Sequence, residues 1–136
     1  CHDLNVKDKV EWVGGYNQQQ AAGLFQKADI LLHPTYNDVC PRLIVESMAC
    51  GVPVVYSASG GAPELVGSDA GIGVAVSEDW AKIHVPKEDA MADAVKRVWA
   101  DIKAYSSAAR KRAVSKFDVR PWVERHGYIF KKLTCV

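Results

Sequence analysis

The sequence contains no long apolar run, and this absence sets the first limit on its function. A membrane-spanning helix needs about 20 consecutive apolar residues, and no stretch of the 136 residues approaches that length. No stretch has the charged, apolar and small-residue order of a secretory signal peptide either. Hydrophobic residues nevertheless make up 49% of the chain. This composition favours an ordinary globular domain with a packed core.

The chain also lacks the residue spacings of a metal site or a disulfide framework. None of its four cysteines forms a Cys-x-x-Cys pair or accompanies a histidine cluster, which favours free thiols in a reducing cytosol. No spacing of histidine and carboxylate residues indicates a metal site. His33 precedes Pro34, and a residue before proline is pushed towards extended backbone. We therefore expect His33 to be structural rather than a ligand contact.

Net charge is close to zero, but it is unevenly distributed. Residues 1–100 carry 8 basic and 13 acidic side chains, whereas residues 101–136 carry 9 basic and 3 acidic ones. A basic amphipathic tail is compatible with peripheral contact to an anionic membrane surface or with another domain. A solvated helix face is the simpler interpretation. Nucleic acid is disfavoured as a partner, because no aromatic platform interleaves the basic residues.

The centre of the chain predicts a strand, a loop and a helix in succession. Residues 29–33 form a short apolar run, turn-forming residues follow at 34–38, and apolar residues then recur at helical spacing after Pro41. Residues 51–56 end that helix with a glycine and open a second buried strand. In an open α/β sheet, ligands bind at the carboxyl edge of the strands. The loop that holds Asp38 is therefore expected at a ligand-binding edge.

Two acids and a helix end are predicted to converge there. Asp38 lies in the loop, and Glu46 follows eight positions later inside the helix. Pro41 suits the first helical position, so the amides of Arg42 and Leu43 stay free to point out of the helix end. Free amides together with the helix dipole attract phosphate.

These residues carry a resemblance to a known family. Asp38, seven intervening residues and Glu46, followed by SMACGVPVV, resemble the signature of the retaining GT-B glycosyltransferases of the group 1 (family 4) type, which use nucleotide sugars. Further matches run almost end to end: VEWVGG at 10–15, ADILLHPT at 28–35, SGGAPELV at 59–66, AGIGV at 70–74 and the segment from Phe117. The resemblance implies an α/β fold, a Rossmann-like parallel sheet flanked by helices.

The resemblance also implies roles for single residues. Glu46 would accept hydrogen bonds from the ribose hydroxyls of the donor nucleotide, and Asp38 would hold hydroxyls of the donor sugar. The turn amides would contact the sugar and the diphosphate, and two earlier residues would lie beside the base. The full donor-binding set is Gly15, Tyr16, Asp38, Val39, Cys40, Arg42, Leu43 and Glu46, with Asp38 and Glu46 as the catalytic pair.

Three of these residues carry a qualification. Asp38 stands where the family prefers glutamate, so its carboxylate is one methylene shorter. The side chain of Arg42 is expected to face solvent rather than clamp phosphate, and Cys40 is expected to neighbour the helix cap rather than act as a nucleophile.

The implied reaction moves a sugar from a UDP- or GDP-linked donor to an acceptor hydroxyl with retention at the anomeric carbon and without a metal or other cofactor. The acceptor would be a glycan, a lipid or a small molecule held by a separate N-terminal domain. The expected location is the cytoplasm, including the cytoplasmic face of a membrane. Two other hypotheses stay open: a non-catalytic module that binds nucleotide sugars or serves assembly, and a nucleotide-sugar epimerase of the same architecture.

Length limits how much of such an enzyme is present. A chain of 136 residues forms one domain. The resemblance implies that residues 1–136 are a partial C-terminal nucleotide-sugar-binding domain, N-terminally incomplete, with 117–136 as its closing helix. The acceptor domain and two strands with their basic phosphate-binding segment would be absent, so the chain alone is expected to be inactive. Strand 29–33 would then be an unprotected apolar edge.

The remaining pattern predicts further elements. Gly60 and Gly61 form a turn that either lies near the donor or is purely structural. Helices are expected at 18–27, from 86 with a buried stripe that includes Ala90, at 106–116 and at 121–133. The family resemblance further implies a strand at 10–13 and a short strand at 70–74.

Overall fold

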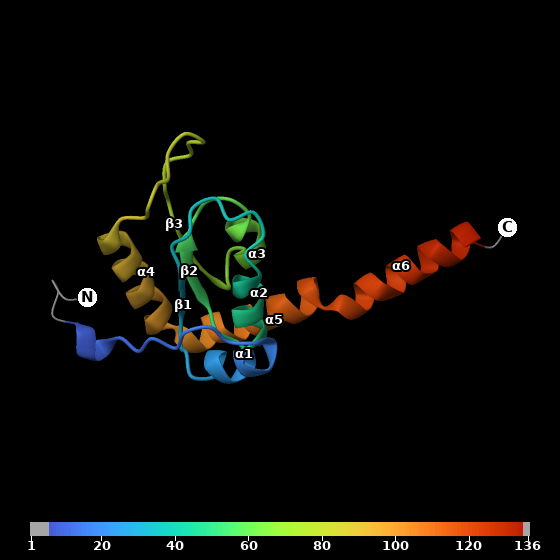
Figure 1. The fold of residues 1–136 in the computed structure, drawn as a ribbon, viewed down its shortest axis with the longest axis horizontal. Helices are drawn as coiled ribbons and strands as arrows, with labels where there is room; N and C mark the ends of the chain where they lie inside the picture. Colours follow the sequence, from blue (N-terminus) through green and yellow to red (C-terminus); the bar gives the residue numbers. More distant parts are fainter. Residues whose placement is uncertain (1–5, 135–136) are drawn as a thin grey trace.

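A computed structural model describes residues 6–134, and it shows a small parallel sheet between helices (Figure 1). The strands are β1 (Leu31–His33), β2 (Val54–Ser57) and β3 (Gly71–Val74), in the order β1-β2-β3. Both pairings are parallel. The Rossmann-like α/β fold expected from the sequence is confirmed.

Helices join the strands and cover both faces of the sheet. After a short 3-10 turn, Lys7–Lys9, the helices are α1 (Gln18–Phe25), α2 (Arg42–Ala49), α3 (Ala62–Val66), α4 (Glu88–Ala100), α5 (Ile102–Phe117) and α6 (Val119–Thr134). The crossovers from β1 through α2 to β2 and from β2 through α3 to β3 are what parallel pairing requires.

Alternate side chains of β2 enter two separate cores. Val54 and Tyr56 pack with residues of α2, α3 and α5, whereas Val55 packs with α4. This division follows from the two-residue period of a strand, which sends successive side chains to opposite faces. Ile44 and Met48 of α2 are fully buried, and burial of such side chains contributes about 2 kcal/mol each. The core therefore fixes α2 against the sheet.

Of two predictions for the N-terminal part of the sheet, one is wrong and one is confirmed. The segment at 10–13 forms no strand: it is extended, Trp12 is 85% exposed, and the described sheet pairs β1 only with β2. The expected strand is therefore wrong, because no neighbouring strand offers hydrogen bonds to this backbone. The prediction that β1 lies at an apolar edge is confirmed, since Leu32 is 53% exposed.

Several helix boundaries also differ from expectation. Pro41 is the N-cap rather than the first residue of α2, with φ −68° and ψ 94°. The fourth helix begins at Glu88 rather than Pro86, and Ala90 is exposed rather than part of its buried stripe. The helix expected from 106 begins at Ile102.

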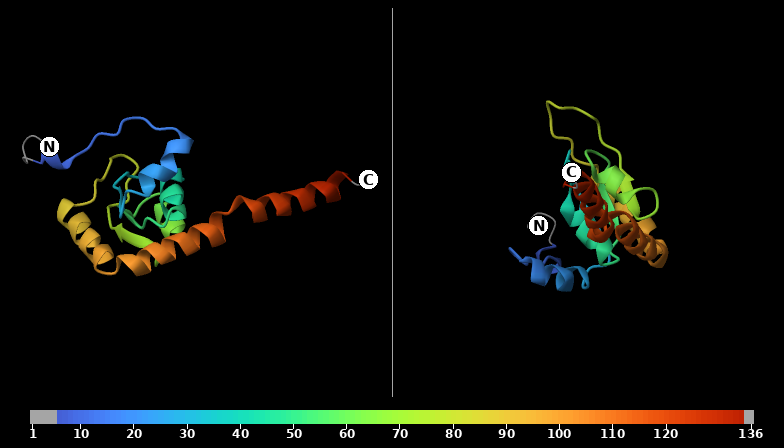
Figure 2. Two further views of the ribbon diagram at one scale, coloured as in Figure 1. Left: turned by 90° about the horizontal axis from the view of Figure 1, so that it is seen from below. Right: turned by 90° about the vertical axis from the view of Figure 1, so that its right-hand side faces the viewer.

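The last helix projects from the body. Figure 2 shows α5 lying along the body and α6 continuing away from it. Asp118 separates the two and caps α6, because its Oδ1 accepts the Arg120 amide at 2.9 Å. Along α6 the apolar side chains are exposed: Val119, Trp122, Val123, Tyr128, Ile129, Phe130 and Leu133. Among the described residues, no helix combines the length and hydropathy of a membrane span.

Candidate functional site

The loops that follow all three strands meet at the carboxyl edge of the sheet. Gly61, after β2, donates its amide to the carbonyl of Asp38 at 2.9 Å, and Asn37 donates its amide to Ser59 Oγ at 3.0 Å. Ser59 Oγ in turn lies 3.0 Å from Ser57 Oγ. These contacts join the loop after β1 to the loop after β2, as the parallel topology predicts.

Gly60 and Gly61 are required by this close approach. A Cβ at Gly60 would lie 2.4 Å from the Asp38 carbonyl oxygen, and one at Gly61 would lie 2.0 Å from that of Val39. Gly60 also has φ +59°, which side chains other than hydrogen adopt at a cost. Both glycines therefore have a structural role. The amide of Gly61 is already bonded to Asp38, and a contact between this turn and a ligand stays a prediction.

Asp38 presents its carboxylate at this edge. The side chain is 35% exposed, its Oδ1 accepts the Cys40 amide at 3.3 Å, and its Oδ2 lies 3.6 Å from His33 Nε2. The preceding residue, Asn37, adopts φ +50°, a left-handed conformation that asparagine tolerates better than most residues. The loop thus turns the carboxylate back over the end of β1.

The amino end of α2 lies next to this loop in the chain. No side chain caps its first turn, so the first amides of the helix, at Arg42 and Leu43, have no helical carbonyl to bind. The Arg42 side chain is exposed, as expected, and Glu46 is exposed one turn further along the helix. Residues four apart share one helix face, so Arg42 and Glu46 point the same way.

A tyrosine connects the third loop to the first. The Tyr36 hydroxyl accepts the Asp79 amide at 2.8 Å and lies 2.7 Å from the Asp79 carbonyl oxygen, to which it can donate. Its ring meets the edge of His84 at a centroid distance of 5.5 Å. The segment after β3 is therefore tied to the loop that holds Asp38.

Asp79 is also shaped by its own loop. Its carboxylate accepts the Ala81 amide at 2.7 Å and lies 3.3 Å from His84 Nε2. These partners, the Ala81 amide foremost, lower the pKa of Asp79. Sequence reasoning missed Tyr36, Asp79 and His84, because no motif marks a contact across 43 residues. The only signal for this contact was the rule that loops after parallel strands gather at one edge of the sheet.

Gly15 and Tyr16 lie in a different part of the structure. They line a hollow of about 350 Å³ beside α1, together with Val13, Gln20, Gly23, Leu24 and Lys27. No residue of the Asp38 loop or of α2 lines that hollow. The structure does not bring Gly15 and Tyr16 together with Asp38 and Glu46, and their place beside a base stays a prediction.

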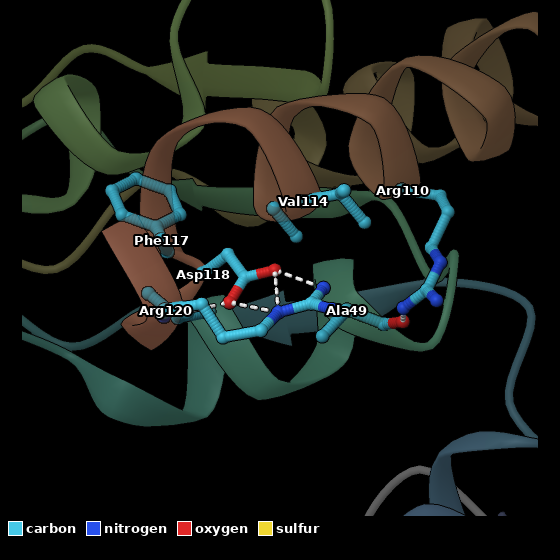
Figure 3. Close-up of a pocket in the computed structure, with 8 residues that line it drawn as sticks. Ala49, Arg110, Val114, Phe117, Asp118 and Arg120 are labelled. Carbon is cyan, nitrogen blue, oxygen red and sulfur yellow. Dashed lines mark hydrogen bonds and ion pairs between the residues drawn. The ribbon is translucent and has the colours of Figure 1, made fainter. Parts of the chain in front are cut away.

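A second hollow lies at the other end of α2. It has a volume of about 280 Å³ and lies between α2, α5 and the start of α6. Figure 3 shows its lining residues, among which Asp118 pairs with Arg120 and Arg110 donates to the carbonyl of Ala49. Ala49 ends α2, whereas the Asp38 loop precedes its first turn. This cavity is separate from the candidate site. Within residues 6–134, no cluster of three or more metal-ligating side chains is present.

Comparison with known proteins places the chain in a family. The family model for glycosyl transferases group 1 matches residues 1–112. A D-inositol 3-phosphate glycosyltransferase of Mycobacteroides abscessus is 35% identical over 83 residues, which are 58% of this chain and 18% of that protein.

Solved structures agree. A sucrose-phosphate synthase of Thermosynechococcus elongatus aligns with a TM-score of 0.78 and 26% identity over 97% of this chain and 32% of its own. The Anabaena protein HepE, solved in complex with UDP-glucose, aligns with a TM-score of 0.71 and 26% identity over 99% of this chain and 35% of its own. The chain thus spans about a third or less of each of these proteins. The structural neighbours of this chain are GT-B glycosyltransferases. The motifs, the fold and the matched residues together show that the chain belongs to the glycosyl transferases group 1 family.

Proposed function

We propose that this chain is the donor-binding part of a glycosyltransferase that passes a sugar from a nucleotide sugar to an acceptor hydroxyl with retention of configuration. The observation that carries the proposal is the Asp38 loop, held by Gly60 and Gly61 beside the uncapped end of α2. Family membership supports the reaction class. The epimerase and the non-catalytic module have no comparable support.

Each residue of the loop and helix has a proposed role. Glu46 accepts hydrogen bonds from the ribose hydroxyls, and Asp38 accepts them from hydroxyls of the donor sugar. The backbone amides between Val39 and Leu43 face the sugar and the diphosphate. The Cys40 amide, which donates to Asp38 Oδ1 in this structure, joins them when that hydrogen bond opens. Gly15 and Tyr16 are proposed to flank the base once the segment that carries them packs against a neighbouring strand.

The chemistry proposed for this edge is electrostatic. As the bond between sugar and phosphate breaks, negative charge grows on the departing diphosphate, and the first amides of α2 point towards it. A well-placed donor that is fixed before the reaction supplies about 3 to 4 kcal/mol of transition-state stabilisation. The dipole of α2 adds to this. That the transfer proceeds without a metal stays a prediction of the family resemblance.

The remainder of the protein's activity is proposed on the same basis. Residues 1–136 form a partial C-terminal domain, with α6 as its closing helix, and a separate N-terminal domain binds the acceptor glycan, lipid or small molecule. The exposed free thiols of Cys40 and Cys50 support a location in the reducing cytosol. The basic side chains of α6 support peripheral contact with an anionic membrane surface.

The donor nucleotide is proposed to carry uridine. One structural neighbour, the Anabaena protein HepE, was solved both with UDP-glucose and with UDP and glucose, whereas the sequence left UDP and GDP open. The test is a thermal melt of the protein with UDP- and GDP-sugars. A ligand at one hundred times its Kd stabilises the native state by about 2.7 kcal/mol, so a UDP-sugar is expected to raise Tm.

Two variants make the melt specific. Glu46→Ala is expected to abolish the rise in Tm, and Glu124→Ala, an exposed glutamate on α6, is expected to keep it. A rise that survives in Glu46→Ala would contradict the assignment of this edge. A further assay measures the release of UDP when an acceptor is supplied. An enzyme releases UDP from the donor, whereas a module that only binds the donor does not.

A further inference from the structure

His33 is a buried polar residue whose ring nitrogen has no partner. The side chain ends β1, is 8% exposed, and its Nε2 makes no hydrogen bond within the described part of the chain. Buried nitrogens of this kind are nearly always hydrogen-bonded. Pairing of His33 with Tyr56 in the sheet holds its backbone in place. Packing alone does not explain why a buried imidazole with a fixed backbone leaves its Nε2 without a hydrogen bond.

The carboxylate of Asp38 is the group that faces it. The distance from Nε2 to Asp38 Oδ2 is 3.6 Å, slightly longer than a hydrogen bond allows. The other oxygen, Oδ1, is occupied by the Cys40 amide. The backbone of Asp38 is anchored through the Gly61 amide. A small rotation of the Asp38 side chain therefore closes the contact without a movement of either backbone.

We propose that His33 is a positioning residue for Asp38. Its Nε2–H donates to Oδ2 and fixes the direction of the carboxylate, whose remaining lone pairs then accept hydroxyl hydrogens of the donor sugar. The inference rests on the proposed function and adds the residue that orients the acid.

The test compares two substitutions at His33 in the full-length protein. His33→Leu removes the donor, whereas His33→Gln keeps an N–H near the position of Nε2. Kd is measured for UDP-glucose and for UDP, since Asp38 faces only the sugar. Loss of one hydrogen bond to a charged group predicts about 10-fold weaker binding of UDP-glucose by His33→Leu. Binding of UDP should be unchanged, and His33→Gln should restore most of the loss.

A second pair of variants tests the route through Asp38. If His33 acts only through that carboxylate, His33→Leu should add no further loss in a protein that already carries Asp38→Ala, which leaves no acceptor for the His33 N–H. Should His33→Leu fail to melt cooperatively, His33→Asn, whose amide stops short of Asp38, takes its place.

Three results would overturn the inference. Equal weakening of UDP and UDP-glucose would show a purely structural role. Unchanged binding of UDP-glucose by His33→Leu would show no role in the donor site. Failure of the unsubstituted protein to bind either ligand would remove the proposed function itself, and this outcome is distinguishable because it appears before any substitution is made.

Discussion

Gly61 carries no Cβ at the point where the backbone after β2 meets the backbone of the Asp38 loop. The space is limited by a carbonyl group rather than by a side chain that can rotate away. The same approach places Asn37 within reach of Ser59. The shape of the candidate site therefore depends on glycines without a Cβ as much as on the acidic residues of the motif.

A single methyl group at Gly61 should therefore disrupt the site. We expect Gly61→Ala to lower the free energy of unfolding by about 1–3 kcal/mol, the usual cost of forcing extra atoms into a packed region, and to abolish the UDP-sugar-dependent rise in Tm. Chemical denaturation and the ligand melt measure the two effects. The matched control is Gly127→Ala, where a Cβ meets nothing within 4 Å and helix propensity favours alanine by about 1 kcal/mol. Equal behaviour of the two variants would contradict the packing argument.

The elements of this fold show which parts a sequence can predict. The strands at 29–33 and 51–56 and the helix after Pro41 followed from apolar periodicity, glycine and proline, because each signal is local, whereas the strand at 70–74 was implied by the family resemblance. The strand at 10–13 was predicted wrongly, since a strand exists only beside a partner that its own sequence does not encode. The Tyr36 contact with Asp79 was missed for the same reason. Asp38 and Glu46 were predicted as site residues from their spacing within the motif, and this stays a prediction, whereas His33 was assigned a structural role from its neighbour Pro34.

The start of α6 should depend on pH through its cap. Arg120 and its amide lower the pKa of Asp118 from 3.8 to about 2. A carboxylate with a depressed pKa in the folded state stabilises the fold above its unfolded pKa, and that contribution is lost as pH falls. Helical circular dichroism should therefore fall between about pH 4 and pH 2 as Asp118 becomes protonated.

Asp118→Asn provides the comparison for this titration. Asparagine caps helices about as well as aspartate but does not ionise, so the part of the acid transition that belongs to the cap should disappear in the variant. Identical pH profiles for the two proteins would show that Asp118 does not stabilise α6.

Within residues 6–134, β1 and β3 are the two edge strands of the sheet. Open edges with apolar side chains pair with other chains, and Leu32 lies on such an edge, half exposed. We expect the chain alone to self-associate with rising concentration, as measured by sedimentation, and Leu32→Lys to reduce this. Leu133→Lys, at an exposed leucine of α6, is the matched control. Suppression by Leu133→Lys alone would instead indicate association through α6.

The contact between Tyr36 and Asp79 also bears on how the chain folds. It joins groups 43 residues apart, one after β1 and one after β3, so its formation closes a long loop of the chain. Contacts between distant segments slow folding, because the entropy of the closed loop is lost before they form. The loop of the candidate site is therefore expected to order late, after the transition state. Loss of the Tyr36 hydroxyl should then speed unfolding and leave the folding rate almost unchanged.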